Sequence, residues 1–164
     1  MTTMNPVSIQ DSYPDGFSHC YGCGRFNERG LQIKSYWDGE EAVCTFTPRS
    51  YHIAIPGYVY GGLIASLIDC HCIATAAAAA YRAEGREIGS EPRLRYVTAA
   101  LHVDYARPTP LGVPLEVRAW ATEIKGRKVV VMATLSAEGE VCARGEVVAV
   151  QMPEHMLPGQ TQER

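Results

Sequence analysis

The sequence has no excess of positive charge. Its 15 Lys and Arg residues stand against 18 Asp and Glu residues, so the formal net charge is −3 at pH 7. Proteins that bind nucleic acid usually present a basic surface to the phosphates, so this balance argues against a nucleic-acid partner. A ligand that carries phosphate groups would need a local basic patch instead.

The sequence also lacks a secretory signal and a long uninterrupted apolar run. Its start contains no basic segment followed by an apolar one, which predicts a cytoplasmic protein. The longest apolar stretch, 63–81, is interrupted by Ser66, Asp69, His71 and Thr75 and is rich in alanine. This composition predicts a buried helix rather than a membrane span.

The sequence shows no internal repeat, and low-complexity sequence is confined to 76–80. A chain of 164 residues is long enough for one domain with a sizeable core. We expect residues 1–18 to form a poorly ordered lead, residues 19–152 to form the domain and residues 153–164 to form a polar tail.

Hydrophobic periodicity predicts two strands, one long helix and four further strands. Alternating segments at 31–37 and 42–47 flank an Asp-Gly pair at 38–39, as in a β-hairpin. The segment from about Tyr60 to Arg82 has no proline and is apolar nearly all round, which predicts a buried helix. Further strands are predicted at 98–107, 115–125, 128–137 and 141–151.

This order of elements predicts an α+β fold, with an antiparallel sheet of about six strands wrapped around one central helix. A helix that is apolar on all sides needs cover on nearly every side, and a strongly twisted sheet provides that cover. This arrangement is the hotdog fold.

The six cysteines are expected to be mostly reduced, because the chain has no secretory signal. Cys20 and Cys23 form a Cys-x-x-Cys pair, and a Cys-His-Cys run occupies 70–72. A zinc site would require a second ligand pair at suitable spacing. The run at 70–72 does not provide one, since neighbouring side chains on a helix point about 100° apart. The sequence therefore predicts buried small thiols and no metal site.

Asp69 is the only acidic residue between Tyr51 and Ala83. Burying a carboxylate costs several kcal/mol unless a partner pairs with it or its pKa rises. No basic residue lies three or four positions away along the helix. Asp69 therefore pairs with a basic residue from another element, meets water at an interface, or takes part in catalysis.

The Gly61-Gly62 pair lies where the helix is expected to begin. Unpaired N–H groups and the dipole at a helix N-terminus stabilise a developing oxyanion. Gly61 lies eight positions before Asp69, about 12 Å along one helix axis, whereas a reacting carbonyl needs both groups at roughly 3 Å. Two antiparallel helices related by a two-fold axis satisfy both distances. The sequence therefore predicts a homodimer with two interfacial sites and leaves pairing of dimers into tetramers open.

Three motifs resemble the hotdog thioesterase superfamily of PaaI type. Residues 56–69 read Pro-Gly-Tyr-Val-Tyr-Gly-Gly, then six residues and Asp, close to the His-Gly-Gly-x6-Asp element of that family. Residues 20–31 resemble its Cys-Phe-Gly-Cys-Gly opening, which continues to Asn and Gly-Leu. Residues 101–108 resemble a family strand that ends in Arg-Pro. The resemblance covers most of residues 20–151.

The resemblance implies hydrolysis of an acyl-CoA thioester without a cofactor. It implies that Asp69 is a general base toward water or a nucleophile that forms a mixed anhydride. It also implies that the N–H of Gly61 polarises the thioester carbonyl. Thr98 lies where some relatives have a serine that orients the attacking water, with an ordinary strand threonine as the alternative. Gly62 and Asn27 belong to the same motifs and are expected to contact the substrate.

Tyr60 departs from the family pattern, because most relatives have His at this position. A phenol donates a hydrogen bond but is no base near neutral pH. His52 in the preceding loop is a candidate replacement, with an ordinary surface histidine as the alternative. Two other functions stay open: a hydroxyacyl thioester dehydratase, which usually needs a catalytic His, and an acyl-CoA-binding protein without catalysis.

Three basic residues are candidates for contacts with the CoA phosphates, namely Arg107, Arg127 and Lys128. The family often uses basic residues near strand ends for this purpose, and guanidinium and ammonium groups suit phosphate oxygens. Solvated charges in a turn are the alternative for Arg127 and Lys128.

Overall fold

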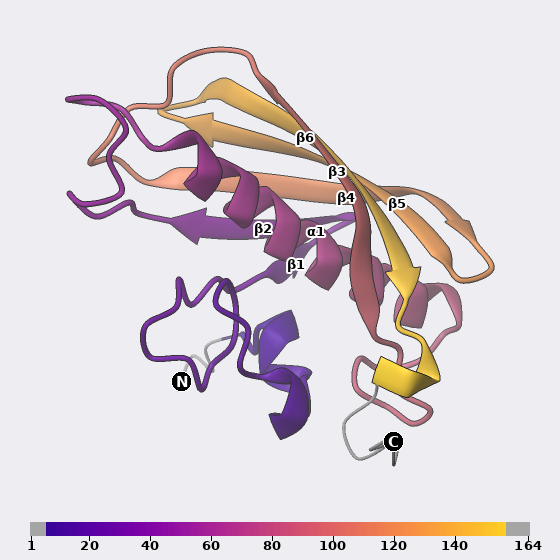
Figure 1. The fold of residues 1–164 in the computed structure, drawn as a ribbon. Coiled ribbons are helices and arrows are strands. Elements are labelled where there is room, and N and C mark those ends of the chain that lie inside the picture. Colours follow the sequence, from indigo (N-terminus) through magenta and orange to yellow (C-terminus); the bar gives the residue numbers. More distant parts are fainter. Residues whose placement is uncertain (1–5, 157–164) are drawn as a thin grey trace, which may run out of the picture.

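The computed structural model describes residues 6–156 and contains one antiparallel sheet curled around one long helix (Figure 1). The elements are β1 (Tyr36–Asp38), β2 (Glu41–Phe46), α1 (Gly61–Ala83), β3 (Tyr96–Tyr105), β4 (Leu115–Lys125), β5 (Lys128–Ala137) and β6 (Glu140–Gln151). The six strands lie in the order β1-β2-β4-β5-β6-β3. The predicted hotdog fold is confirmed. Residues 1–5 of the predicted lead and 157–164 of the predicted tail lie outside the described range.

Helix α1 forms the centre of the core. It begins directly after Tyr60, which is extended, and ends before Glu84, whose N–H donates to carbonyls of the last turn. The alanines at 76–80 are buried and leave room for the strands to approach the helix closely. By length and composition α1 is the one described helix that could cross a membrane, but 72% of its most apolar window is buried inside the fold. The predicted buried helix is confirmed.

The N-terminal segment packs against the domain, so the predicted poorly ordered lead is wrong for the part that the structure describes. A 3₁₀ turn at Ile9–Ser12 buries Ile9 and Gln10. The Gln10 amide bonds to Ser35, whose hydroxyl lies 2.7 Å from Nδ1 of His71 on α1. Burial lowers the pKa of His71 to about 4. These side chains tie the N-terminal segment to the helix through contacts that leave no local pattern in the sequence.

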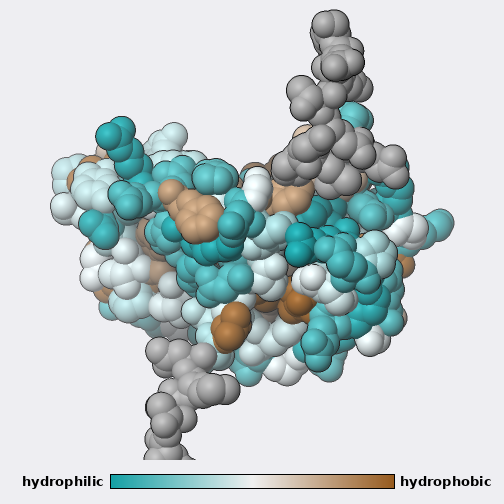
Figure 2. Space-filling view, turned by 90° about the horizontal axis from the view of Figure 1, so that it is seen from below, coloured by the Kyte–Doolittle hydropathy of each residue, from teal (hydrophilic) through white to brown (hydrophobic). Residues whose placement is uncertain are grey.

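The side of the molecule below α1 has a largely hydrophilic surface. Figure 1 places the N-terminal segment on this side of the helix. Figure 2 shows the same side, where hydrophobic side chains reach the surface only in separate patches. On this side the apolar helix is therefore not exposed as one continuous hydrophobic surface.

The first predicted strand is much shorter than expected. The stretch 31–35 is a loop, and β1 starts at Tyr36. The N–H groups of Leu31 and Ile33 donate to carbonyls of the loop at 21–22, not to a neighbouring strand. Alternating burial in this stretch therefore comes from packing under that loop.

Strand β3 forms one edge of the sheet and lies beside the helix. Its register with β6 shifts between Thr98 and Ala100, which marks a β-bulge. Farther along, Leu101 and Tyr105 are 39% and 53% exposed. An edge strand of ten residues with exposed apolar side chains is suited to pairing with another chain.

Candidate active site

Asp69 lies on α1 and faces a cleft of about 350 Å³. The residue is half-buried, and its Oδ1 accepts a hydrogen bond of 2.6 Å from the hydroxyl of Thr98 on β3. No Lys, Arg or His among residues 6–156 forms an ion pair with it. The carboxylate is thus partly exposed rather than fully buried, and the described chain does not neutralise it.

Regular strand alternation accounts for the position of Thr98. Residues two apart on a strand share one face, and Thr98 follows the buried Tyr96 by two positions, before the bulge begins. Only Oδ1 of Asp69 receives a hydrogen bond in the described chain. A carboxylate accepts hydrogen bonds on both oxygens, so Oδ2 is left for a water molecule or a substrate in the cleft.

Gly61 and Gly62 begin α1 as expected and present free N–H groups. Among the described residues no hydrogen bond has either N–H as its donor. The hydroxyl of Tyr105 donates to the Gly61 carbonyl over 2.8 Å and fixes the start of the helix against β3. Gly61 lines a second cleft, of about 550 Å³, together with Arg107 and part of the loop at 54–59.

Within one chain, Gly61 and the Asp69 carboxylate lie in different clefts, and Gly62 lines neither of them. The cleft that contains Asp69 and Thr98 does not include Gly61, and the Gly61 cleft includes neither of them. Eight helical positions separate Gly61 from Asp69 by about 12 Å. A single carbonyl therefore cannot contact both groups within one chain, and each cleft is a candidate half-site.

Tyr60 and His52 lie next to each other in the loop before α1. The Tyr60 ring folds back over Gly62, where a side chain would overlap it. The Tyr60 N–H donates to the His52 carbonyl over 2.9 Å. The His52 ring packs against two aromatic rings, and its Nδ1 accepts from the Arg49 N–H over 3.0 Å. Burial, and then the charge of Arg49, lower the pKa of His52. Neither Tyr60 nor His52 lines either cleft.

The three basic candidates do not gather in one place. Arg107 lines the cleft that contains Gly61 and pairs with Glu140 over 2.8 Å. Arg127 and Lys128 lie at the turn between β4 and β5, where Arg127 donates to a β6 carbonyl and Lys128 pairs with a β4 glutamate over 3.0 Å. Only Arg107 is therefore brought near a candidate half-site.

Asn27 has local partners in the cysteine-containing loop. Its Nδ2 donates to the His19 carbonyl, and its Oδ1 accepts from the Arg29 N–H, each over 3.2 Å. It lines neither cleft. In this structure Asn27 therefore shapes the loop that carries Cys20.

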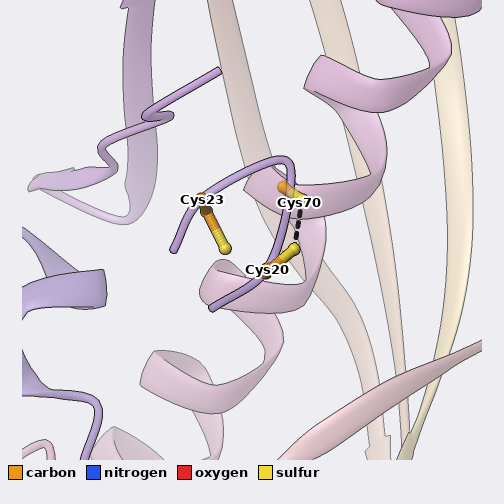
Figure 3. Close-up of side chains that lie close together, drawn as sticks. All are labelled: Cys20, Cys23 and Cys70. Atoms are coloured by element: carbon orange, nitrogen blue, oxygen red, sulfur yellow. Dashed lines mark hydrogen bonds between the residues drawn. The ribbon is translucent and has the colours of Figure 1, made fainter. Parts of the chain in front are cut away.

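Sequence reasoning considered three cysteines without placing them together beside Asp69, and it missed one arginine there. Cys20 and Cys23 come from the N-terminal loop and Cys70 from α1, and Figure 3 shows their side chains close together. Arg95 also lines the Asp69 cleft, with its guanidinium 3.8 Å above the ring of Tyr13. The prediction that these thiols are buried is wrong for Cys20, which is exposed. Cys70 is 50 positions from Cys20, so no local spacing links them.

Comparison with known proteins identifies the family of this chain. A family model described as the thioesterase superfamily matches residues 56–150, a range that contains α1 with Asp69, strands β3 to β5 and all of β6 except Gln151. The chain belongs to the thioesterase superfamily. A crystal structure of a thioesterase superfamily protein from Shewanella loihica PV-4 is 48% identical, has a TM-score of 0.66 and covers 86% of this chain and 100% of that one.

Other members of the superfamily are more distant. Acyl-coenzyme A thioesterase THEM4 from Xenopus laevis is 32% identical over 108 residues, which are 66% of this chain and 43% of that protein. This chain spans less than half the length of the curated relatives it matches. The E. coli PaaI protein, at 18% identity and a TM-score of 0.61 over 75% of this chain and 81% of that one, shares the fold.

Proposed function

We propose that this member of the thioesterase superfamily hydrolyses an acyl-CoA thioester to a carboxylic acid and CoA. The observation that carries the proposal is the Asp69 carboxylate, which faces a cleft, bonds to the Thr98 hydroxyl and has no ion-pair partner within residues 6–156. Such a carboxylate is free to take up a proton or to attack a carbonyl. The similarity to an acyl-coenzyme A thioesterase of Xenopus laevis supports the choice of substrate.

In this mechanism Asp69 and Thr98 act as a pair. The Thr98 hydroxyl holds Oδ1, while Oδ2 takes a proton from a water molecule whose oxygen attacks the thioester carbonyl. The tetrahedral intermediate then collapses, the C–S bond breaks, and the CoA sulfur takes up the proton from Asp69. Alternatively Oδ2 attacks the carbonyl directly, the C–S bond breaks and CoA leaves as a thiolate. Water then hydrolyses the mixed anhydride to the free acid and the Asp69 carboxylate, and the proton that water releases goes to the CoA sulfur. The same geometry serves both routes.

The site is completed by a second copy of the chain. The oxyanion of the intermediate needs an N–H donor close to Asp69, and the N–H of Gly61 of the partner subunit supplies it in a two-fold dimer. The exposed edge strand β3, with Leu101 and Tyr105 on its surface, supports this assembly. Each dimer then has two complete sites, and further pairing into a tetramer is not needed for the chemistry.

The second cleft is the better candidate for binding CoA. Arg107 lines it and offers a guanidinium to phosphate oxygens. Tyr60 does not line this cleft itself, but it is 58% exposed between Val59 and Gly61, which do, and its hydroxyl stands where relatives have a histidine. Asn27, Arg127 and Lys128 line neither cleft, so no binding role is proposed for them.

The test is the release of free thiol from a panel of acyl-CoAs by the purified protein. Asp69→Asn keeps the size of the side chain and an acceptor for Thr98 but removes the negative charge. We expect kcat to fall by about 10²–10⁴-fold. Asp38→Asn is the matched control, since Asp38 is exposed, pairs with Arg118 over 3.0 Å and lines neither cleft. Binding of acyl-CoA without any turnover by the wild-type protein would contradict the proposal.

A further inference from the structure

Cys20, Cys23 and Cys70 bring three thiols together beside the Asp69 cleft. The Sγ atoms of Cys20 and Cys70 lie 3.8 Å apart, and all three sulfurs lie within 4.8 Å of one another. Figure 3 shows the two loop cysteines next to the turn of α1 that carries Cys70. All three are free thiols.

The 3.8 Å between the sulfurs of Cys20 and Cys70 fits a tetrahedral metal ion, and no pair of the three sulfurs is more than 4.8 Å apart. Zn²⁺ binds thiolates at about 2.3 Å, which separates neighbouring sulfurs of a tetrahedron by about 3.8 Å. A disulfide instead requires sulfurs about 2.05 Å apart. Sulfur ligands favour Zn²⁺, whereas Mg²⁺ and Ca²⁺ prefer oxygen. We propose that Cys20, Cys23 and Cys70 bind one Zn²⁺ ion per chain, with a water molecule from the cleft as fourth ligand.

The backbone of the loop supports this arrangement. The N–H of Gly22 donates to Cys20 Sγ over 3.3 Å, and the N–H of Gly24 donates to the Cys20 carbonyl over 2.8 Å. An N–H that points at a sulfur stabilises its thiolate form. A Cβ at Gly22 would overlap the Cys70 sulfur. The absence of a side chain at this position therefore lets the loop reach the helix and brings the sulfurs together.

The charges around the cluster also suit a cation. Zn²⁺ displaces the protons of the three thiols when it binds, which leaves three thiolates, one ion and a single net negative charge. The positive charge of Arg95 acts on Cys23 and partly balances that charge.

The fourth ligand of the proposed ion is a water molecule from the cleft, not a further side chain. His19 precedes Cys20, but its ring packs against Phe26 with centroids 5.5 Å apart, and the three sulfurs alone form the described ligand cluster. Cys20 and Cys70 line the same cleft as Asp69, which has room for a water molecule. Because Cys70 directly follows Asp69, the ion fastens the N-terminal loop to the helical turn that carries the carboxylate.

The test uses the full-length chain, purified with a thiol reductant and stripped of metal by a chelator. Co²⁺ is added first, because tetrahedral Co²⁺–thiolate sites absorb visible and near-ultraviolet light. We expect saturation at one Co²⁺ per chain, loss of this absorption when Zn²⁺ displaces Co²⁺, and a higher Tm for the zinc-loaded protein. Neither readout depends on thioester hydrolysis.

Serine variants identify the ligands. Cys20→Ser, Cys23→Ser and Cys70→Ser are each expected to weaken Zn²⁺ binding by about 100-fold or more, beyond the 10- to 100-fold effect of losing an outer partner. Cys142→Ser is the matched control, because Cys142 is buried, bonds to the Glu140 carbonyl over 3.5 Å and lies outside the cluster. This variant is expected to bind Zn²⁺ like the wild type.

Three results would overturn the proposal. The first is a reduced wild-type protein that binds no Co²⁺ with thiolate absorption. The second is unchanged Zn²⁺ affinity in Cys20→Ser and Cys70→Ser variants whose circular dichroism shows a native fold. The third is a Cys20–Cys70 disulfide in the purified protein, found by mass spectrometry, together with no metal binding after reduction. The wild-type measurements keep the test decisive if a serine variant does not fold.

Discussion

The hydroxyl of Thr98 is the one hydrogen-bond donor to the Asp69 carboxylate among residues 6–156. A hydrogen bond to a charged group contributes about 1.5–3 kcal/mol, which corresponds to about a 10- to 100-fold change in rate. Thr98→Val keeps the shape of the side chain and removes this donor. We therefore expect kcat for thiol release to fall by about 10- to 100-fold, with little change in KM.

Thr98→Ser is the matched control for this prediction. Serine retains the hydroxyl and loses only a methyl group, so kcat is expected to stay within a few-fold of the wild-type value. Steady-state kinetics of both variants separate the two roles that the sequence left open. Equal kcat values in the valine, serine and wild-type proteins would identify Thr98 as an ordinary strand residue.

Single residues could be singled out from the sequence where their chemistry contrasts with their neighbours. Asp69 is conspicuous because it interrupts an apolar helix, and Gly61 because it lies at the expected start of that helix. Arg95 gives no such signal, and the Cys-His-Cys run that contains Cys70 does not indicate that Cys70 meets Cys20. Their importance comes from the residues they meet in space, and those residues lie far away in the sequence.

At the scale of elements, a close approach of helix α1 to strand β6 depends on a glycine. A Cβ at Gly145 on β6 would overlap Cγ2 of Ile68 on α1. Gly145→Ala is therefore expected to lower the free energy of unfolding by about 1–3 kcal/mol, as overpacking of a core does. Urea unfolding at equilibrium measures this loss.

A double variant checks that the loss comes from this contact. Ile68→Ala removes Cγ2 and by itself costs about 2–5 kcal/mol of stability. When Gly145→Ala is added, the combined loss is expected to be smaller than the sum by on the order of 1 kcal/mol. If the two losses of stability add strictly, a steric overlap between position 145 and Ile68 is not the cause of the loss in Gly145→Ala.

Element boundaries were predictable where burial and backbone pairing follow the same pattern. The predicted strands 115–125 and 128–137 have the observed bounds of β4 and β5. The stretch 31–35 alternates equally well, but its N–H groups bind a loop. Hydrophobic periodicity reports which side chains are buried and does not report which backbone supplies the hydrogen-bond partner. The packed N-terminal turn was missed for the same reason.

At the scale of the whole molecule, the proposed dimer joins two half-sites that one chain keeps apart. Gly61→Pro tests the N–H directly, because proline at the first helical position removes a donor that the helix does not use. Tyr60 is already extended, with φ −61° and ψ 130°, as the residue before a proline requires. A Cβ at Gly61 meets the Tyr105 ring at an ordinary 3.5 Å. This variant is expected to fold and to lose about 10²–10³-fold in kcat.

Combining the two defects in one dimer tests whether the site is shared. In a mixed dimer of Gly61→Pro and Asp69→Asn chains, one site contains both defects and the other contains Asp69 from one chain and Gly61 from the other. Equal co-expression makes about half of the dimers mixed, so the preparation is expected to recover about a quarter of wild-type activity. Size-exclusion chromatography verifies the dimers, and the separately purified variants provide the baseline. If the mixed preparation shows no more activity than that baseline, both groups act within one chain, and the arrangement of the site proposed here is incorrect.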